Sequence, residues 1–155
     1  MTDNEGFLIY EEGTPARQIP IWSSRALYYA TWYGHILRFD LRNRTWHVVK
    51  PHKEHYSPAT GRKGEHKYLR YHTGSKKSVL ANKCFHRLVL MSWKPNPSLF
   101  ATQCDHIDNN PRNNRVDNLR WCTDLENKRY ASAIRRGETI LSNLQKSVFY
   151  AYQSK

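Results

Sequence analysis

Four polar residues in the stretch 103–128 could together hydrolyse a phosphodiester bond. Asp105 and His106 are adjacent, and Asn118 and Asn127 follow after an Asn-rich segment. Carboxylate and amide oxygens are hard ligands that suit Mg²⁺, which completes its shell with water and substrate phosphate. An imidazole can remove a proton from water near neutral pH. These residue types indicate a site with one metal ion and a histidine base.

The same stretch predicts the elements that must position these side chains. Gln103 to Ile107 is expected to form a strand, and Leu119 to Cys122 a second strand beside it. The intervening residues 108–115 are rich in Asn and Asp, which favour turns because they tolerate left-handed backbone and bond their own chain. Thr123 and Glu126 fit a capping box at the start of a helix. The expected order is therefore strand, loop, strand and helix.

This order suggests a part for each polar residue. Asn127 lies early in the helix, on the face turned toward the hairpin, and the helix is expected to end at Gly137. Adjacent strand residues point to opposite faces, so His106 can act on water without occupying a metal ion held by Asp105 and Asn127. Asn118 is expected to bond the loop backbone and to fix the rotamer of His106.

These positions, with the Asn-rich loop and the Asn-Leu-Arg-Trp run at 118–121, resemble the HNH endonucleases of the zinc-free phage and intron homing type. The resemblance implies a ββα-metal unit, with His106 as general base and Asn118 as the residue that braces the loop. Asp105 and Asn127 would bind one divalent ion, Mg²⁺ or else Mn²⁺. The products would carry 5′-phosphate and 3′-hydroxyl ends. The plain alternative is a polar hairpin that only stabilises a small domain.

A second resemblance lies upstream. Residues 29–38 are similar to the short β module that precedes the nuclease in many phage HNH enzymes, and residues 83–93 resemble the helix that links the two. His86, near the start of that helix, is expected to cap it or to bond a neighbouring loop. The fold class expected is α+β: an antiparallel β module, a linking helix, the HNH unit and a short C-terminal helix. The predicted divisions are an acidic leader and linker (1–21), a basic β module (22–82), the linking helix and nuclease (83–136) and an amphipathic helix (137–155).

Charge favours a polyanionic partner. The chain has 155 residues with a formal net charge of +12, a length that suits one compact domain with an appendage. Its first acidic residues, Asp3, Glu5, Glu11 and Glu12, all precede the first basic residue, Arg17. The basic remainder also carries many aromatic residues. We therefore expect double-stranded DNA as the partner.

Two hairpins are expected in the basic module. Residues 36–41 and 45–50 flank a turn at 42–44, while 67–72 and 77–80 flank a second turn. Residues 51–64 are expected to be a loop. The hairpins could follow DNA phosphates or could only buttress the nuclease. The predicted DNA-binding residues are Arg42, Arg44, Lys76, Lys77, Arg112, Arg115 and Arg120.

Cysteine spacing argues against a structural zinc site. Cys84, Cys104 and Cys122 form no closely spaced pair, and reduced thiols are expected. The sequence shows neither a signal peptide nor an apolar run that could span a membrane. We therefore expect no membrane partner and a cytoplasmic protein of a bacterial host cell, with a phage gene as one possible source.

Three functional questions stay open at this point. The main alternative is a DNA-binding regulator or architectural protein with a vestigial nuclease site. Hydrolysis of RNA is a further alternative, because the same chemistry serves either backbone. The oligomeric state also matters, since a monomer would nick one strand and a homodimer could cut both.

Overall fold

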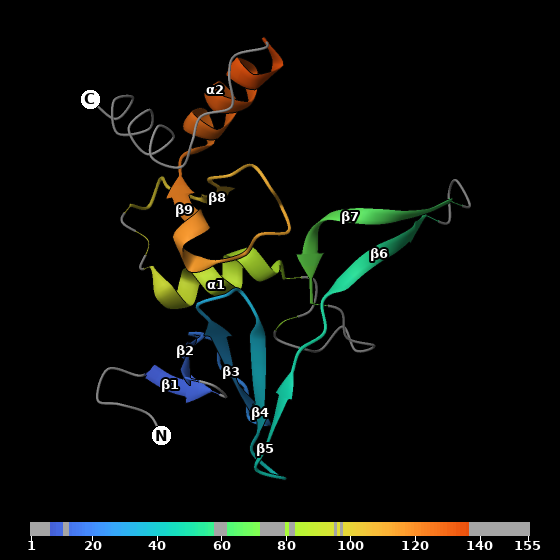
Figure 1. Ribbon diagram of the computed structural model, residues 1–155, viewed down its shortest axis with the longest axis vertical. Coiled ribbons are helices and arrows are strands. Elements are labelled where there is room, and N and C mark those ends of the chain that lie inside the picture. The colour runs from blue at the N-terminus through green and yellow to red at the C-terminus, as the bar shows by residue number, and fades with distance from the viewer. Residues whose placement is uncertain are drawn as a thin grey trace.

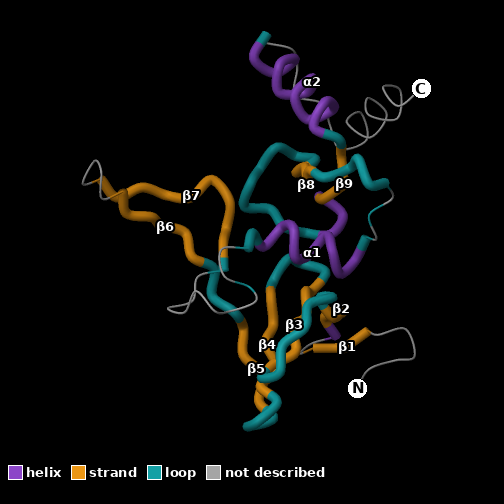
Figure 2. The backbone as a smooth tube through the Cα atoms, turned by 180° about the vertical axis from the view of Figure 1, so that it is seen from behind, coloured by secondary structure: helices purple, strands orange, loops and turns teal. Residues whose placement is uncertain are grey.

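The computed structural model describes residues 7–10, 13–57, 62–71, 80, 83–94, 96 and 98–136. The described part is elongated, with a β-sheet at one end and α2 at the other (Figure 1). Helix α1 lies between the sheet and the small β8–β9 hairpin, and a two-stranded ribbon, β6–β7, projects to one side (Figures 1 and 2). This arrangement agrees with the predicted α+β class.

The larger sheet has five antiparallel strands in sequence order. The first hairpin predicted in the basic module, β4–β5, is confirmed, and Asp40 shapes its turn by accepting bonds from the backbone N–H groups of Arg42 and Asn43. Residues 1–21, expected as leader and linker, contain two further strands of the sheet. The strands are β1 (Phe7–Tyr10), β2 (Thr14–Gln18), β3 (Ala26–Thr31), β4 (Ile36–Asp40) and β5 (Thr45–Val48).

The prediction of a loop at 51–64 is wrong. β6 (His52–Ser57) and β7 (Arg62–Arg70) pair as an antiparallel ribbon. Residues 67–70 belong to β7, which pairs with β6. Of the strand expected at 77–80 only Leu80 is described, so the second predicted hairpin lies outside the described residues. The cause of the error is that β6 and the first part of β7 are almost entirely polar, so no alternation of apolar and polar residues indicated strands there.

Helix α1 (Phe85–Trp93) confirms the linking helix. Its buried Phe85 and Leu88 share one core with Ile36 of the sheet and Leu119 of the small hairpin. The indole of Trp93 donates a hydrogen bond to the backbone oxygen of Ala30 at 2.8 Å. The helix thus fixes the small hairpin on the sheet through a continuous apolar core.

The predicted strand–loop–strand–helix unit is also confirmed. It comprises β8 (Gln103–His106), a 3₁₀ turn (Val116–Asn118), β9 (Leu119–Cys122) and α2 (Asp124–Arg135). The capping box is present, because Thr123 N–H donates to the Glu126 carboxylate at 2.6 Å and Glu126 N–H donates to the Thr123 hydroxyl at 3.2 Å. The helix stop at Gly137 and the helix at 137–155 lie outside the described residues. Among the described helices, none is long and apolar enough to cross a membrane.

Candidate active site

Asp105, His106 and Asn127 line one cavity of about 520 Å³. They reach it from the end of β8 and from the first turns of α2, as the sequence predicted. β7, the start of α1 and the loop after β8 also contribute residues to its lining. Its remaining lining residues are Lys67, Tyr68, Arg70, Cys84, His86, Arg87, Gln103, Cys104, Asn109, Pro111, Tyr130, Ala131 and Arg135.

Asn118 holds the loop after β8 in one shape. Its Oδ1 accepts a bond from Asp108 N–H at 2.9 Å, and its Nδ2 donates to Asp108 Oδ1 at 2.9 Å and to the backbone oxygen of Asn113 at 2.8 Å. Burial alone would raise the pKa of Asp108, but hydrogen bonds from Asn113, Asn110 and Asn118 outweigh it and lower that pKa. The loop is therefore braced by Asn118 and by an ionised Asp108.

The rotamer of His106 is fixed by Asn114, not by Asn118 as expected. His106 is 5% exposed, and its Nε2 lies 2.9 Å from Oδ1 of the equally buried Asn114. An amide oxygen only accepts, so Nε2 donates and the lone pair of the ring lies on Nδ1. Nothing in the sequence favours one asparagine of an Asn-rich loop over another as the partner of His106.

Gly34 in the β3–β4 turn holds this asparagine in place. It adopts φ +87°, and a Cβ added there would lie 2.5 Å from the backbone oxygen of Asn114. Any larger residue would thus push the loop away and would also be strained. The β module therefore supports the candidate base through a direct backbone contact.

Asp105 is paired with Arg120, the residue opposite it in the β8–β9 register. Arg120 donates to Asp105 Oδ2 from Nε at 3.3 Å and from Nη2 at 3.2 Å. The side chains of Asp105 and Arg120 are only 10% and 14% exposed, respectively. This pair orients the carboxylate at the edge of the cavity.

The donor set fits a hard divalent ion. Asp105, which carries a carboxylate, and Asn127, which carries an amide, line the same cavity. Within the described ranges, no group of three His, Cys, Asp or Glu side chains could hold a metal ion. Two oxygen ligands suit Mg²⁺, which keeps several waters and binds through few protein groups.

Comparison with known proteins agrees with this geometry. A family model described as HNH endonuclease matches residues 102–129. Over these residues, called the HNH module below, the chain is similar to the HNH endonucleases. An uncharacterised HNH endonuclease of Acanthamoeba polyphaga mimivirus is 48% identical over 42 residues, which are 27% of this chain and 12% of that protein.

The fold likeness extends beyond the HNH module. A solved structure described as "DNA binding and cleavage by the HNH homing endonuclease I-HmuI" matches with a TM-score of 0.50 at 21% identity. The match covers 84% of this chain and 64% of that one, so this chain spans less than two thirds of either relative. At 21% sequence identity, the match shows that the two folds are similar.

The sequence indicated neither Tyr68 nor His86 as a neighbour of His106, the candidate general base. The ring of Tyr68 stacks on that of His106, with centroids 5.8 Å apart and planes at 9°. The ring centroids of His86 and His106 lie 5.0 Å apart. His86 was expected to cap α1 or to bond a neighbouring loop, but α1 has no side-chain capping bond, and within the described residues His86 Nδ1 has no hydrogen-bond partner. Burial, with the nearby His106, Arg87 and Arg70, lowers the pKa of His86 to about 3. No spacing rule links positions 68 and 86 to position 106.

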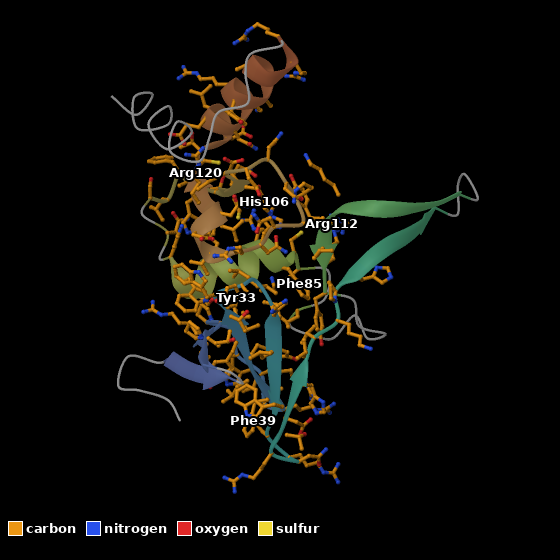
Figure 3. All side chains as sticks on the ribbon, viewed as in Figure 1. Tyr33, Phe39, Phe85, His106, Arg112 and Arg120 are labelled. Atoms are coloured by element: carbon orange, nitrogen blue, oxygen red, sulfur yellow. The ribbon has the colours of Figure 1, made fainter. Side chains whose placement is uncertain are left out.

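The predicted DNA-binding residues are scattered around the molecule. Arg42 and Arg44 are exposed in the β4–β5 turn, at the end of the molecule far from the HNH module (Figure 1). Arg112 and Arg120 lie on either side of His106 (Figure 3). Arg115 forms a bidentate pair with Asp117, at 3.1 and 3.0 Å. The other two predicted residues, Lys76 and Lys77, lie outside the described residues.

Proposed function

We propose that this chain is a metal-dependent DNA endonuclease whose general base is His106. The observation that carries the proposal is that Asp105, His106 and Asn127 line one cavity beside a braced loop. The match of residues 102–129 to the HNH endonucleases supports it independently of the geometry.

The chain's own groups suit hydrolysis. His106 donates from Nε2 to Asn114, so Nδ1 is the atom that takes the proton from water. The water oxygen then bonds to phosphorus, the bond from phosphorus to the 3′ oxygen breaks, and that oxygen takes up a proton from solvent. Asp105 and Asn127 would hold the Mg²⁺ ion, which supplies charge stabilisation at the phosphate and at the leaving oxygen.

The proposed substrate is double-stranded DNA. The chain has a formal net charge of +12, and basic residues surround the cavity. The homing endonuclease whose solved structure is similar binds and cleaves DNA, which supports the same polymer here. One active site acts on one strand, so a monomer would nick DNA. A cytoplasmic location, where DNA is accessible, belongs to the same proposal.

Cleavage of supercoiled plasmid tests this function. The wild type should nick plasmid with Mg²⁺ and not with EDTA, and His106→Ala should cut about 10²–10⁴-fold more slowly with DNA affinity nearly unchanged. His47→Ala is the matched control, because His47 is exposed on β5, outside the cavity.

Three other results of the plasmid experiment would each refute part of the proposal. Binding without cleavage would favour a regulator with a vestigial site, and cleavage of RNA alone would replace the substrate. A His106→Ala variant that cuts at the wild-type rate would show that His106 is not the base.

A further inference from the structure

Two aromatic rings from outside the HNH module contact the ring of His106. Tyr68 is on β7 and His86 is on α1, both upstream of the matched residues 102–129. The Tyr68 and His86 rings are also in contact, with centroids 4.7 Å apart. The three rings therefore form one cluster, in which each ring touches the other two.

The contacts on His106 are complementary. Asn114 fixes one edge of the imidazole through a 2.9 Å hydrogen bond. A single hydrogen bond of this kind does not by itself set the tilt of the ring about the axis of the bond. Tyr68 lies nearly parallel to the imidazole, at 9°, and so restricts this tilt. His86 packs at 53° and supports both other rings.

In a purely structural role, the burial of His86 would be energetically unfavourable. His86 is 5% exposed, and within the described part of the chain its Nδ1 has no hydrogen-bond partner. A buried polar atom left without a partner costs about 1–3 kcal/mol, so an apolar side chain would serve packing better. Its lowered pKa keeps it uncharged, so it does not repel His106 when that ring takes up a proton.

We propose that Tyr68 and His86 are positioning residues that hold His106 in the orientation needed to accept a proton. Because this assignment rests on the proposed function, it deepens that function: the active site includes parts of the β6–β7 ribbon and of α1. Both residues act through His106, so their loss should slow the chemical step without weakening DNA binding. A misplacement of about 1 Å in an active site can cost about 10²-fold in rate.

Paired substitutions in the full-length chain test this assignment. At saturating enzyme, Tyr68→Leu should lower the single-turnover nicking rate by about 10–100-fold, with unchanged DNA affinity in EDTA. Tyr68→Phe keeps the ring and should restore the rate to within about threefold of wild type. His86→Leu and His86→Phe form a second pair with the same expected contrast.

Nuclear magnetic resonance of the histidine rings gives a readout that does not depend on activity. The signals of His106, assigned by their loss in His106→Ala, should shift in Tyr68→Leu because the ring current of Tyr68 is removed. Tyr71→Leu is the matched control: Tyr71 packs edge-on against Tyr28, with centroids 6.4 Å apart. It should lower thermal stability without moving the His106 signals or the rate of folded enzyme.

The outcomes separate the two proposals. If both leucine variants nick at the wild-type rate with unmoved His106 signals, the positioning role is overturned. If His106→Ala itself retains wild-type activity, the proposed base fails, whatever the leucine variants do. If Tyr68→Leu does not fold, the His86 pair decides the question by the same rate and signal criteria.

Discussion

The guanidinium of Arg120 directs two donors at the same oxygen of Asp105, at 3.3 and 3.2 Å. The two residues face each other across β8 and β9, and both side chains are at most 14% exposed. The proposed metal ligand is therefore oriented, and partly neutralised, by an arginine that the sequence placed among the DNA-binding residues. Orienting the carboxylate of Asp105 and contacting DNA are different roles for Arg120, and they predict different effects of a substitution.

The Arg120→Gln variant distinguishes between these two roles of Arg120. Removal of a positive charge beside Asp105 should strengthen the attraction of that carboxylate for Mg²⁺ and lower the half-saturating Mg²⁺ concentration on the order of threefold to tenfold. Arg120→Lys keeps the charge and serves as the control. Titration of nicking activity with Mg²⁺ gives the measurement. An unchanged Mg²⁺ requirement, with a salt slope of binding reduced by about 0.9, would instead make Arg120 a phosphate contact.

Asn127→Ala should abolish nicking at ordinary Mg²⁺ concentrations, and excess Mg²⁺ should rescue it better than it rescues Asp105→Ala. A neutral amide contributes less to holding the ion than a carboxylate does. Asn127→His should retain activity with a preference for transition metals, because imidazole is a softer ligand. Metal titrations check both, with Lys128→Ala as control because the Lys128 side chain is 73% exposed. Unaltered metal dependence in Asn127→Ala would mean that α2 supplies no ligand.

The buried His86 should make stability depend on pH. Its pKa in the folded chain, about 3, lies below its ordinary value of 6.5. Between pH 6.5 and about pH 3, the unfolded chain binds a proton at His86 that the folded chain does not bind. The contribution of the neutral His86 to the free energy of unfolding is therefore complete above pH 6.5 and decreases as the pH falls below it. The loss is about 1.4 kcal/mol per pH unit, or about 2–3 kcal/mol near pH 4.5.

Urea denaturation near neutral and acidic pH measures this effect, and His86→Phe should lack it. Asp108 also has a lowered pKa, but its loss of stability begins only as the pH falls toward its ordinary value of 3.8. Equal pH dependence in the wild type and in His86→Phe would contradict the burial of a neutral imidazole.

Arg42 and Arg44 test whether the sheet contacts DNA. Their turn is at the end of the molecule far from His106 (Figures 1 and 3), so contact there would require DNA to extend along the long axis. Changing both to Gln should weaken binding and reduce the salt slope by about 0.9 for each lost phosphate contact. Single-turnover cleavage at saturating enzyme should survive. An unchanged slope would make the sheet a scaffold and direct the search to Arg112 and Arg115.

The sequence alone determined the HNH unit, because local rules specify it. The hairpin strands, the Asn-rich loop and the Thr123–Glu126 capping box each depend on residues within a few positions of one another. The convergence of Asp105, His106 and Asn127 followed from the order of these elements. The β4–β5 hairpin was predictable for the same reason, because its turn is closed by hydrogen bonds among residues 40–43.

Only the tertiary structure decided what surrounds the base. Asn114, and not Asn118, bonds His106, because Gly34 lets the β3–β4 turn approach the loop closely enough to place it. Tyr68 and His86 reach His106 through the packing of β7 and α1 on the hairpin. Contacts between residues this far apart in the chain depend on how elements pack, and no local pattern of residue types encodes that packing.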